Sequence, residues 1–160
     1  MNLKRVISGG QTGADRAALI AAKAAGLETG GWMPRGFRAQ DGNRPEFAER
    51  YGIREHESDR YPPRTALNVK EADATVRFAT DWESPGEVLT LKLIKRYGRP
   101  HLDVTPGGPA APADVAAWLV RHDVRVLNVA GNSERTAPGI EARVTAFLGE
   151  VFAALGEQPG

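Results

Sequence analysis

The residues that could do chemistry begin with the run Ser8-Gly9-Gly10-Gln11-Thr12-Gly13, placed where a short apolar strand gives way to a helix. A glycine pair directly after a strand permits a sharp turn and the close approach of a ligand to the backbone. The free N–H groups and the dipole of the following helix favour an anion. Ser8 and Thr12 add hydroxyl groups and Gln11 adds an amide. The run therefore predicts a phosphate cradle, and the alternative is a tight turn whose glycines serve packing only.

The spacing of this turn matches neither the P-loop pattern nor the Gly-x-Gly-x-x-Gly pattern of dinucleotide sites. Asp15 and Arg16 follow in the first turn of the helix, where Arg16 would bring a cation to the ligand. Asp15 would either cap the helix N-terminus or accept a hydrogen bond from a ligand hydroxyl or base edge, and we favour the cap.

Four polar residues further along the chain are additional candidates. Arg35 would reach an anion at the level of the turn or remain a solvated loop arginine. Arg64 and Asn68 share one face of a predicted helix, where they would line a pocket, join a neighbouring subunit or serve as capping and surface residues. Asn128 ends a buried strand, and it would either tie down the following turn or contact the ligand.

Strands and helices alternate along the sequence. We expect strands over residues 3–8, 74–79, 100–104 and 124–129, and helices over 15–26, 88–97, 113–122 and 139–155. This alternation predicts an α/β fold, a Rossmann-like three-layer sandwich with a mostly parallel sheet.

The segment 28–63 is dense in glycine, proline and charge. We expect a short strand near 31–33, a short helix near 46–51, a strand near 53–55, and a further helix opening after Pro62-Pro63. A loop-rich stretch of this length inside a compact domain is expected to be functional.

Composition bounds the remaining possibilities. At 160 residues, 41% of them hydrophobic, the chain predicts one ligand-binding domain over residues 1–155 and a frayed tail over 156–160. A formal net charge of +1, with no run of five or more like charges, predicts no nucleic-acid partner. With no cysteine and three histidines that lack ligand spacing, no metal site is expected. The absence of a signal-like segment or a long apolar run predicts a cytoplasmic protein without membrane contact.

Several ordered motifs together resemble the molybdenum carrier family. This family belongs to the superfamily of the lysine-decarboxylase-like (LOG) cytokinin-activating enzymes and the DNA-uptake protein DprA. The resemblance implies a Rossmann-like fold, a ligand pocket above the carboxyl ends of the strands, and a homo-oligomer. The segments that carry it are 7–16, 29–36, 40–42, 64–69, 97–100, 127–134 and 138–140.

One departure from these relatives concerns chemistry. The cytokinin-activating enzymes carry a second glycine motif, whose last residue is a glutamate that helps to cleave an N-glycosidic bond. Leu93 stands at that place here, so cleavage by that route is not expected. Gly86 and Glu87 would form the second half of the anion site, although Glu87 puts a negative charge where carrier relatives usually have glycine or threonine.

These observations favour a molybdenum cofactor carrier or nucleotide-binding protein that holds a phosphate-bearing small molecule on the glycine turn, with no catalytic residue assigned. The cofactor stays undetermined between a molybdenum cofactor and a nucleotide. The alternative is a nucleotide-processing hydrolase or transferase of the LOG-like superfamily that uses Asp15 or Glu87 as acid or base. A third possibility is an oligomeric interaction module with a vestigial pocket.

Overall fold

The computed structural model describes residues 2–157, and strands alternate with helices along most of that length. In chain order the elements are β1 (Arg5–Ile7), α1 (Ala14–Ala24), β2 (Glu28–Met33), β3 (Arg38–Ala39), β4 (Gly42–Asn43), α2 (Phe47–Tyr51), β5 (Ile53–Glu55), α3 (Tyr61–Glu71), β6 (Ala74–Phe78), α4 (Pro85–Tyr97), β7 (His101–Val104), α5 (Pro112–Arg121), β8 (Val126–Gly131) and α6 (Ile140–Gly156).

Six strands form one sheet in the order β5-β2-β1-β8-β6-β7, and every pair in it is parallel. The first strand is central, because Val6 pairs with Thr29 of β2 on one side and with Leu127 of β8 on the other. All five residues of β6 are buried, as expected for a strand covered on both faces. The predicted Rossmann-like α/β fold is confirmed.

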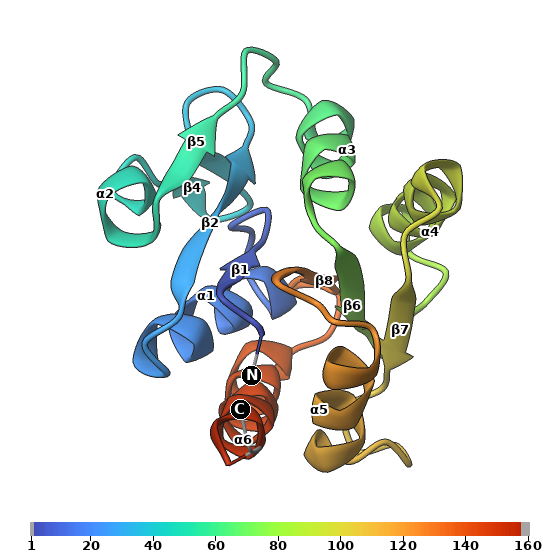
Figure 1. Cartoon of the computed structure of the whole chain (residues 1–160). Helices are drawn as coiled ribbons and strands as arrows, with labels where there is room; N and C mark the ends of the chain where they lie inside the picture. Colours follow the sequence, from blue (N-terminus) through green and yellow to red (C-terminus); the bar gives the residue numbers. More distant parts are fainter. Residues whose placement is uncertain (1, 158–160) are drawn as a thin grey trace.

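Helices cover both faces of this sheet. Figure 1 shows α1, α5 and α6 on one face and α3 and α4 on the other. Helix α1 packs closely against α6 because three alanines of α1 are fully buried and small enough to let the two helices approach. They are Ala17, Ala18 and Ala22. The main core lies between this layer and the sheet and includes Phe78 and Leu127.

The segment 28–63 is more regular than its composition predicts. The strand expected near 31–33 begins at Glu28, and a small antiparallel hairpin, β3–β4, was not expected at all. The helix and strand expected near 46–51 and 53–55 are present as α2 and β5. Helix α3 begins at Tyr61, before the two prolines. Proline is tolerated in the first turn of a helix because the N–H group that it lacks would have no acceptor within the helix there.

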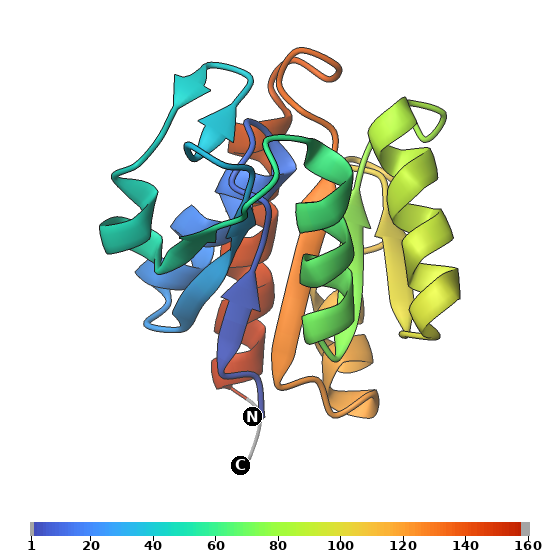
Figure 2. The same ribbon diagram turned by 90° about the horizontal axis from the view of Figure 1, so that it is seen from above.

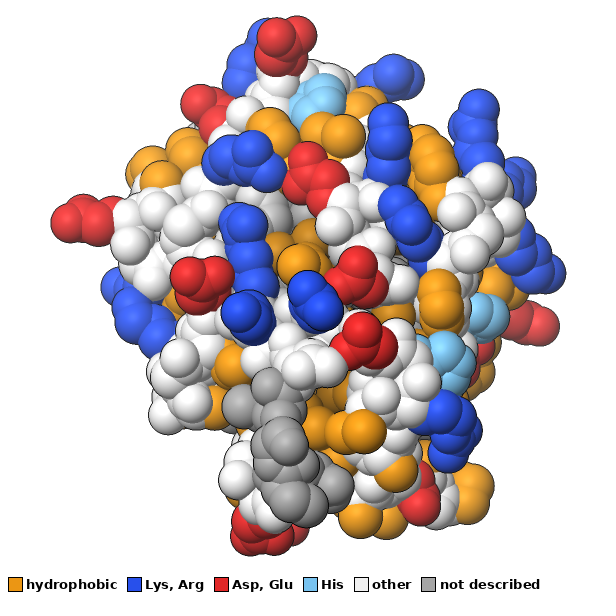
Figure 3. All heavy atoms as spheres, viewed as in Figure 1, with side chains coloured by type: hydrophobic (Ala, Val, Ile, Leu, Met, Phe, Trp, Pro, Cys, Tyr) orange, Lys and Arg blue, Asp and Glu red, His pale blue; other side chains and the backbone are white. Residues whose placement is uncertain are grey.

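The C-terminal helix continues through Gly156, which was expected to begin a frayed tail, and residues 158–160 lie outside the described residues. Among residues 2–157 no helix has the length and apolar character needed to cross a membrane. On the face shown in Figure 3, basic and acidic side chains are interspersed with apolar ones. This distribution agrees with the near-zero net charge of the chain.

Candidate functional site

A cavity of about 370 Å³ opens at the carboxyl edge of the sheet. The chain leaves β1 through α1 toward β2, and it leaves β6 through α4 toward β7, which lies in the opposite direction across the sheet. The order of connections therefore reverses around β8, and open α/β sheets bind ligands at such a switch point. Figure 2 shows the hairpin β3–β4 (cyan) and the segment after β8 (orange to red) at this same end of the molecule.

Residues from five parts of the chain meet in the cavity wall. They come from the turn after β1, the β3–β4 hairpin, the start of α3, the start of α4, and the end of β8 with its following loop. Nine of the residues singled out from sequence are among them: Gly9, Gln11, Thr12, Asp15, Arg64, Asn68, Gly86, Glu87 and Asn128.

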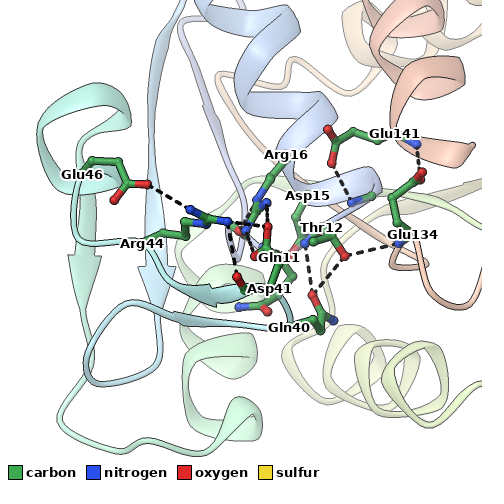
Figure 4. Close-up of polar contacts among 12 residues, drawn as sticks. Gln11, Thr12, Asp15, Arg16, Gln40, Asp41, Arg44, Glu46, Glu134 and Glu141 are labelled. Atoms are coloured by element: carbon green, nitrogen blue, oxygen red, sulfur yellow. Dashed lines mark hydrogen bonds and ion pairs between the residues drawn. The ribbon is translucent and has the colours of Figure 1, made fainter.

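The N–H groups of the turn after β1 already have acceptors within the protein. The Thr12 N–H donates to Gln40 Oε1 at 3.1 Å, and the Gly13 N–H donates to Glu141 Oε1 at 3.0 Å (Figure 4). The Gln11 N–H donates to Asp15 Oδ2 at 3.2 Å. A phosphate on this turn would have to displace a glutamine and two carboxylates, so the N-terminus of α1 is capped from within.

Asp15 does not cap its helix in the expected way. Gly13 occupies the N-cap position with φ of 87°, and Asp15 instead holds the turn through the Gln11 N–H. Burial raises the pKa of the Asp15 carboxyl to about 6, and the nearby guanidinium of Arg64 opposes part of that rise.

Arg64 is the largely buried cation of the cavity. Its Nη1 lies 3.9 Å from Asp15 Oδ2, and a Cβ atom on Gly9 would lie only 1.8 Å from the same nitrogen. Any side chain at position 9 would therefore force the Arg64 guanidinium to shift. Burial lowers the pKa of Arg64, and its Nε has no hydrogen-bond partner in residues 2–157.

Glu87 is the second buried carboxylate, with 3% of the residue exposed. Its Oε2 accepts a hydrogen bond from Asn132 Nδ2 at 3.3 Å, while its Oε1 has no partner within the described chain. Burial, followed by repulsion from Asp15, raises the pKa of Glu87 to about 7. The Glu87 side chain thus titrates near neutrality beside a cavity.

The first turn of α4 is open on the cavity side. A Cβ atom on Gly86 would meet no atom within 4 Å, and the N-cap residue Ser84 makes no side-chain capping bond. The first N–H groups of a helix have no partner inside the helix. This N-terminus, unlike that of α1, therefore keeps donors available to a ligand.

The other predicted site residues do not line the cavity. Ser8 Oγ donates to the Asp15 carbonyl, and Gly10 adopts φ of 68° close to the side chain of Met33. Arg16 forms a two-pronged ion pair with Asp41, both bonds at 2.6 Å (Figure 4). Arg35 is exposed, and its guanidinium lies 4.0 Å from Asp59.

The two asparagines predicted from sequence face the cavity and also have structural partners. Asn68 binds both the N–H and the carbonyl of Trp32, fixing α3 against β2. Asn128 Nδ2 donates to Thr75 Oγ1 at 3.2 Å, which ties β8 to β6.

Asn132 is the cavity residue that sequence reasoning missed as a site residue. Its Oδ1 accepts hydrogen bonds from the N–H groups of Thr80 and Asp81, and its Nδ2 contacts Glu87. The signal was present, because Gly131-Asn132-Ser133 directly follows a buried strand just as Gly9-Gly10 does. Gln40 was missed as well, since no sequence pattern fixes where the hairpin folds.

Leu93 packs with Val69 and Ile94 in the small core between α3 and α4 and is absent from the cavity wall. Thr90, one turn earlier, lines the cavity and donates its hydroxyl to the Gly86 carbonyl at 2.8 Å. In the described part of the chain, no group of three acidic or histidine side chains could hold a metal ion.

Fold and cavity define the chain as a Rossmann-like protein with a ligand-sized cavity at the switch point of its sheet. The sequence model of the Circularly permutated YpsA SLOG family matches residues 6–152, and the chain belongs to this family. It is also similar to a solved structure, that of the “Putative molybdenum carrier protein” from Syntrophus aciditrophicus SB. The two chains are 35% identical over 94% of this chain and 95% of the other, with a TM-score of 0.84. The comparison with curated proteins gave no match. The resemblance to the molybdenum carrier family is confirmed.

Proposed function

We propose that this protein binds a phosphate-bearing small molecule, a nucleotide or a molybdenum cofactor, and holds it without turning it over. The observation that carries the proposal is the cavity of about 370 Å³ at the switch point, with the first turns of α1 and α4 in its wall. A cavity of this size suits a ligand of a few hundred daltons. The name of the relative from Syntrophus aciditrophicus SB favours the carrier role.

Within this proposal, the phosphate binds at the first turn of α4 rather than on the turn after β1. The α1 turn is occupied by Gln40 and Glu141, whereas Gly86 faces open space and its helix end makes no side-chain capping bond. A helix N-terminus with free N–H groups is a favourable site for an anion.

The test uses Gly86→Asp, which places a carboxylate where the phosphate would lie. The matched control is Gly149→Asp in α6, where a Cβ atom also meets nothing within 4 Å. Thermal unfolding is measured with GMP, AMP, molybdopterin and inorganic phosphate. A ligand at one hundred times its Kd stabilises the native state by about 2.7 kcal/mol. We expect a matching rise in Tm for wild type and the control and none for Gly86→Asp.

No ligand-induced rise in the wild type with any of these four probes would refute the proposed function. A rise that survives Gly86→Asp would refute the α4 phosphate site while leaving ligand binding intact. Gly10→Asp is unsuitable as a probe, because a Cβ atom there would lie 2.7 Å from Met33 Sδ in a backbone with positive φ.

A second candidate function is a nucleotide-processing enzyme, favoured by the two carboxylates that face one cavity. The pKa of Asp15 is raised to about 6 and that of Glu87 to about 7, values suited to proton transfer near neutral pH. Incubation with nucleoside monophosphates, followed by chromatography for free base, tests it. If the wild type releases free base and Glu87→Gln does not, the enzyme function replaces the carrier proposal. If the wild type releases no free base, the binding proposal stands.

We further propose a homo-oligomer and a cytoplasmic location, both taken from the family resemblance and the composition. Light scattering coupled to size-exclusion chromatography measures the first. A mass equal to the 17.2 kDa chain would contradict it.

A further inference from the structure

Three of the four buried side-chain atoms that lack a hydrogen-bond partner in residues 2–157 belong to cavity residues. They are Gln11 Oε1, Glu87 Oε1 and Arg64 Nε. The large majority of buried polar side-chain atoms in native proteins have a partner, so three unpaired atoms on one cavity wall point to groups that a bound molecule supplies. Two of the three are acceptors and one is a donor.

The chemical identity of each atom is fixed by its neighbours. Gln11 Nε2 donates to the Arg38 carbonyl at 2.9 Å and to the Gly9 carbonyl at 3.3 Å, so its Oε1 is the free acceptor. Glu87 Oε2 is held by Asn132, which leaves Oε1 free, and Oε1 is an acceptor once the carboxyl is ionised above its pKa of about 7. An arginine Nε can only donate. A ligand that completes this set offers two donors and one acceptor.

All three residues lie near Asp15, and Gln11 contacts it through the backbone. The Gln11 N–H donates to Asp15 Oδ2, and Arg64 Nη1 lies 3.9 Å from the same oxygen. Glu87 is close enough for its charge to be repelled by Asp15. With two carboxylates and one guanidinium, the side chains of this corner suit a donor-rich group, whereas the phosphate is assigned to the backbone N–H groups at the start of α4.

We propose that this corner, formed by Gln11, Arg64 and Glu87, recognises a 2-amino-4-oxopyrimidine edge, the edge shared by guanine and pterin rings. That edge carries a ring N–H, an exocyclic amino group and a carbonyl oxygen, which are two donors and one acceptor. The amino group donates to Glu87 Oε1, the ring N–H donates to Gln11 Oε1, and the carbonyl accepts from Arg64. The assignment rests on the proposed function, since it places the ring of the same ligand whose phosphate lies at α4.

Other nucleotide groups complement the corner less well. Adenine offers one amino donor and a ring acceptor, and uracil offers one donor and two acceptors, so each leaves a buried acceptor unpaired. A ribose diol also presents two donors, but it is common to all ribonucleotides. Recognition of the ribose at this corner would therefore give equal affinity for nucleotides of every base, and an affinity comparison distinguishes it from recognition of the ring.

The experiment is calorimetric titration of the full chain with GMP, IMP, XMP and AMP, which share the ribose and the phosphate. IMP lacks only the 2-amino group of GMP. We expect GMP to bind about 10- to 100-fold more tightly than IMP, the effect of one hydrogen bond to a charged group. A second arm compares neopterin with its 4-amino analogue and distinguishes a pterin from a nucleotide ligand.

Glu87→Gln tests the carboxylate directly, with Glu150→Gln on the exposed side of α6 as the control. Because Asn132 Nδ2 faces Oε2, the new amide would turn its oxygen toward Asn132 and its NH₂ toward the ligand donors. We expect the preference of GMP over IMP to disappear in Glu87→Gln and to persist in the control. Circular dichroism and Tm establish that both variants fold.

The outcomes separate the two proposals. Equal affinity for the four nucleotides, with equal affinity for the two pteridines, would overturn the ring assignment and leave the proposed function standing. A preference for GMP that survives Glu87→Gln would also overturn the ring assignment. Absence of binding by every probe would overturn both. Neopterin has no phosphate. If neopterin binds tightly and this binding is lost in Glu87→Gln, the result supports the ring assignment but not the phosphate site at α4.

Discussion

Replacing Glu87 with glutamine is expected to stabilise the ligand-free protein in a pH-dependent manner. Burial raises the pKa of Glu87 from 4.5 to about 7. Between these values the carboxyl is protonated in the native state and ionised in the unfolded state, so the native state binds more protons and stability falls as pH rises. A shift of about 2.5 units corresponds to roughly 3 kcal/mol, fully lost above pH 7. Glutamine cannot ionise and avoids this loss.

The charged groups that act on Glu87 come from four elements and are Asp15, Arg64, Arg77 and Asp103. They remain in the variant. Urea unfolding at pH 5 and pH 8 measures the difference between Glu87→Gln and wild type, with exposed Glu150→Gln as the control. We expect little difference at pH 5 and a gain of about 3 kcal/mol at pH 8. The same difference at both pH values would refute the titration of Glu87 as its cause.

Three further substitutions test the architecture of the site. Gly9→Ala puts a Cβ atom at 1.8 Å from Arg64 Nη1 and should lower the free energy of unfolding in urea by about 1–3 kcal/mol. The control Gly149→Ala in α6 should raise it by about 0.5–1 kcal/mol, and equal effects would contradict the close approach of Arg64. Asn132→Ala leaves the N–H groups of Thr80 and Asp81 without their acceptor and should lower the free energy of unfolding by about 2–4 kcal/mol. A loss below about 1 kcal/mol would mean that water replaces the side chain. Arg16→Ala removes the two-pronged ion pair to Asp41 and should speed amide hydrogen exchange in residues 38–44. Arg16→Lys should have an intermediate exchange rate. Unchanged exchange would show that other contacts hold the hairpin.

The sequence predicted the layers of the fold well because strong local signals marked them. Alternating apolar strands, an alanine-rich helix and glycines at helix ends identified eight of the main elements, four strands and four helices. The hairpin β3–β4 escaped prediction because its strands are two residues each, too short for any periodicity. The start of α3 was placed too late because the two prolines look like a break, although they fit the first turn.

Sequence reasoning named nine of the residues that line the cavity, but it did not predict the hydrogen bonds that they make. The polar residues at strand ends converge on one cavity because parallel strands bring their carboxyl ends to one edge. What sequence could not show is that Gln40 and Glu141, from distant segments, take the N–H groups of the α1 turn. Burial could not be read from sequence either, and it is burial that raises the pKa of Glu87 to about 7.

The central position of β1 has a consequence for how the chain folds during synthesis. The first strand pairs with β8, whose residues emerge from the ribosome more than a hundred positions later. Until then β1 has one free edge and α1 has an uncovered alanine face that only α6 can bury. Ribosome-bound chains that end before Val126 should therefore be protease-sensitive and dependent on chaperones, and the cavity should form only after the last third of the chain has been released.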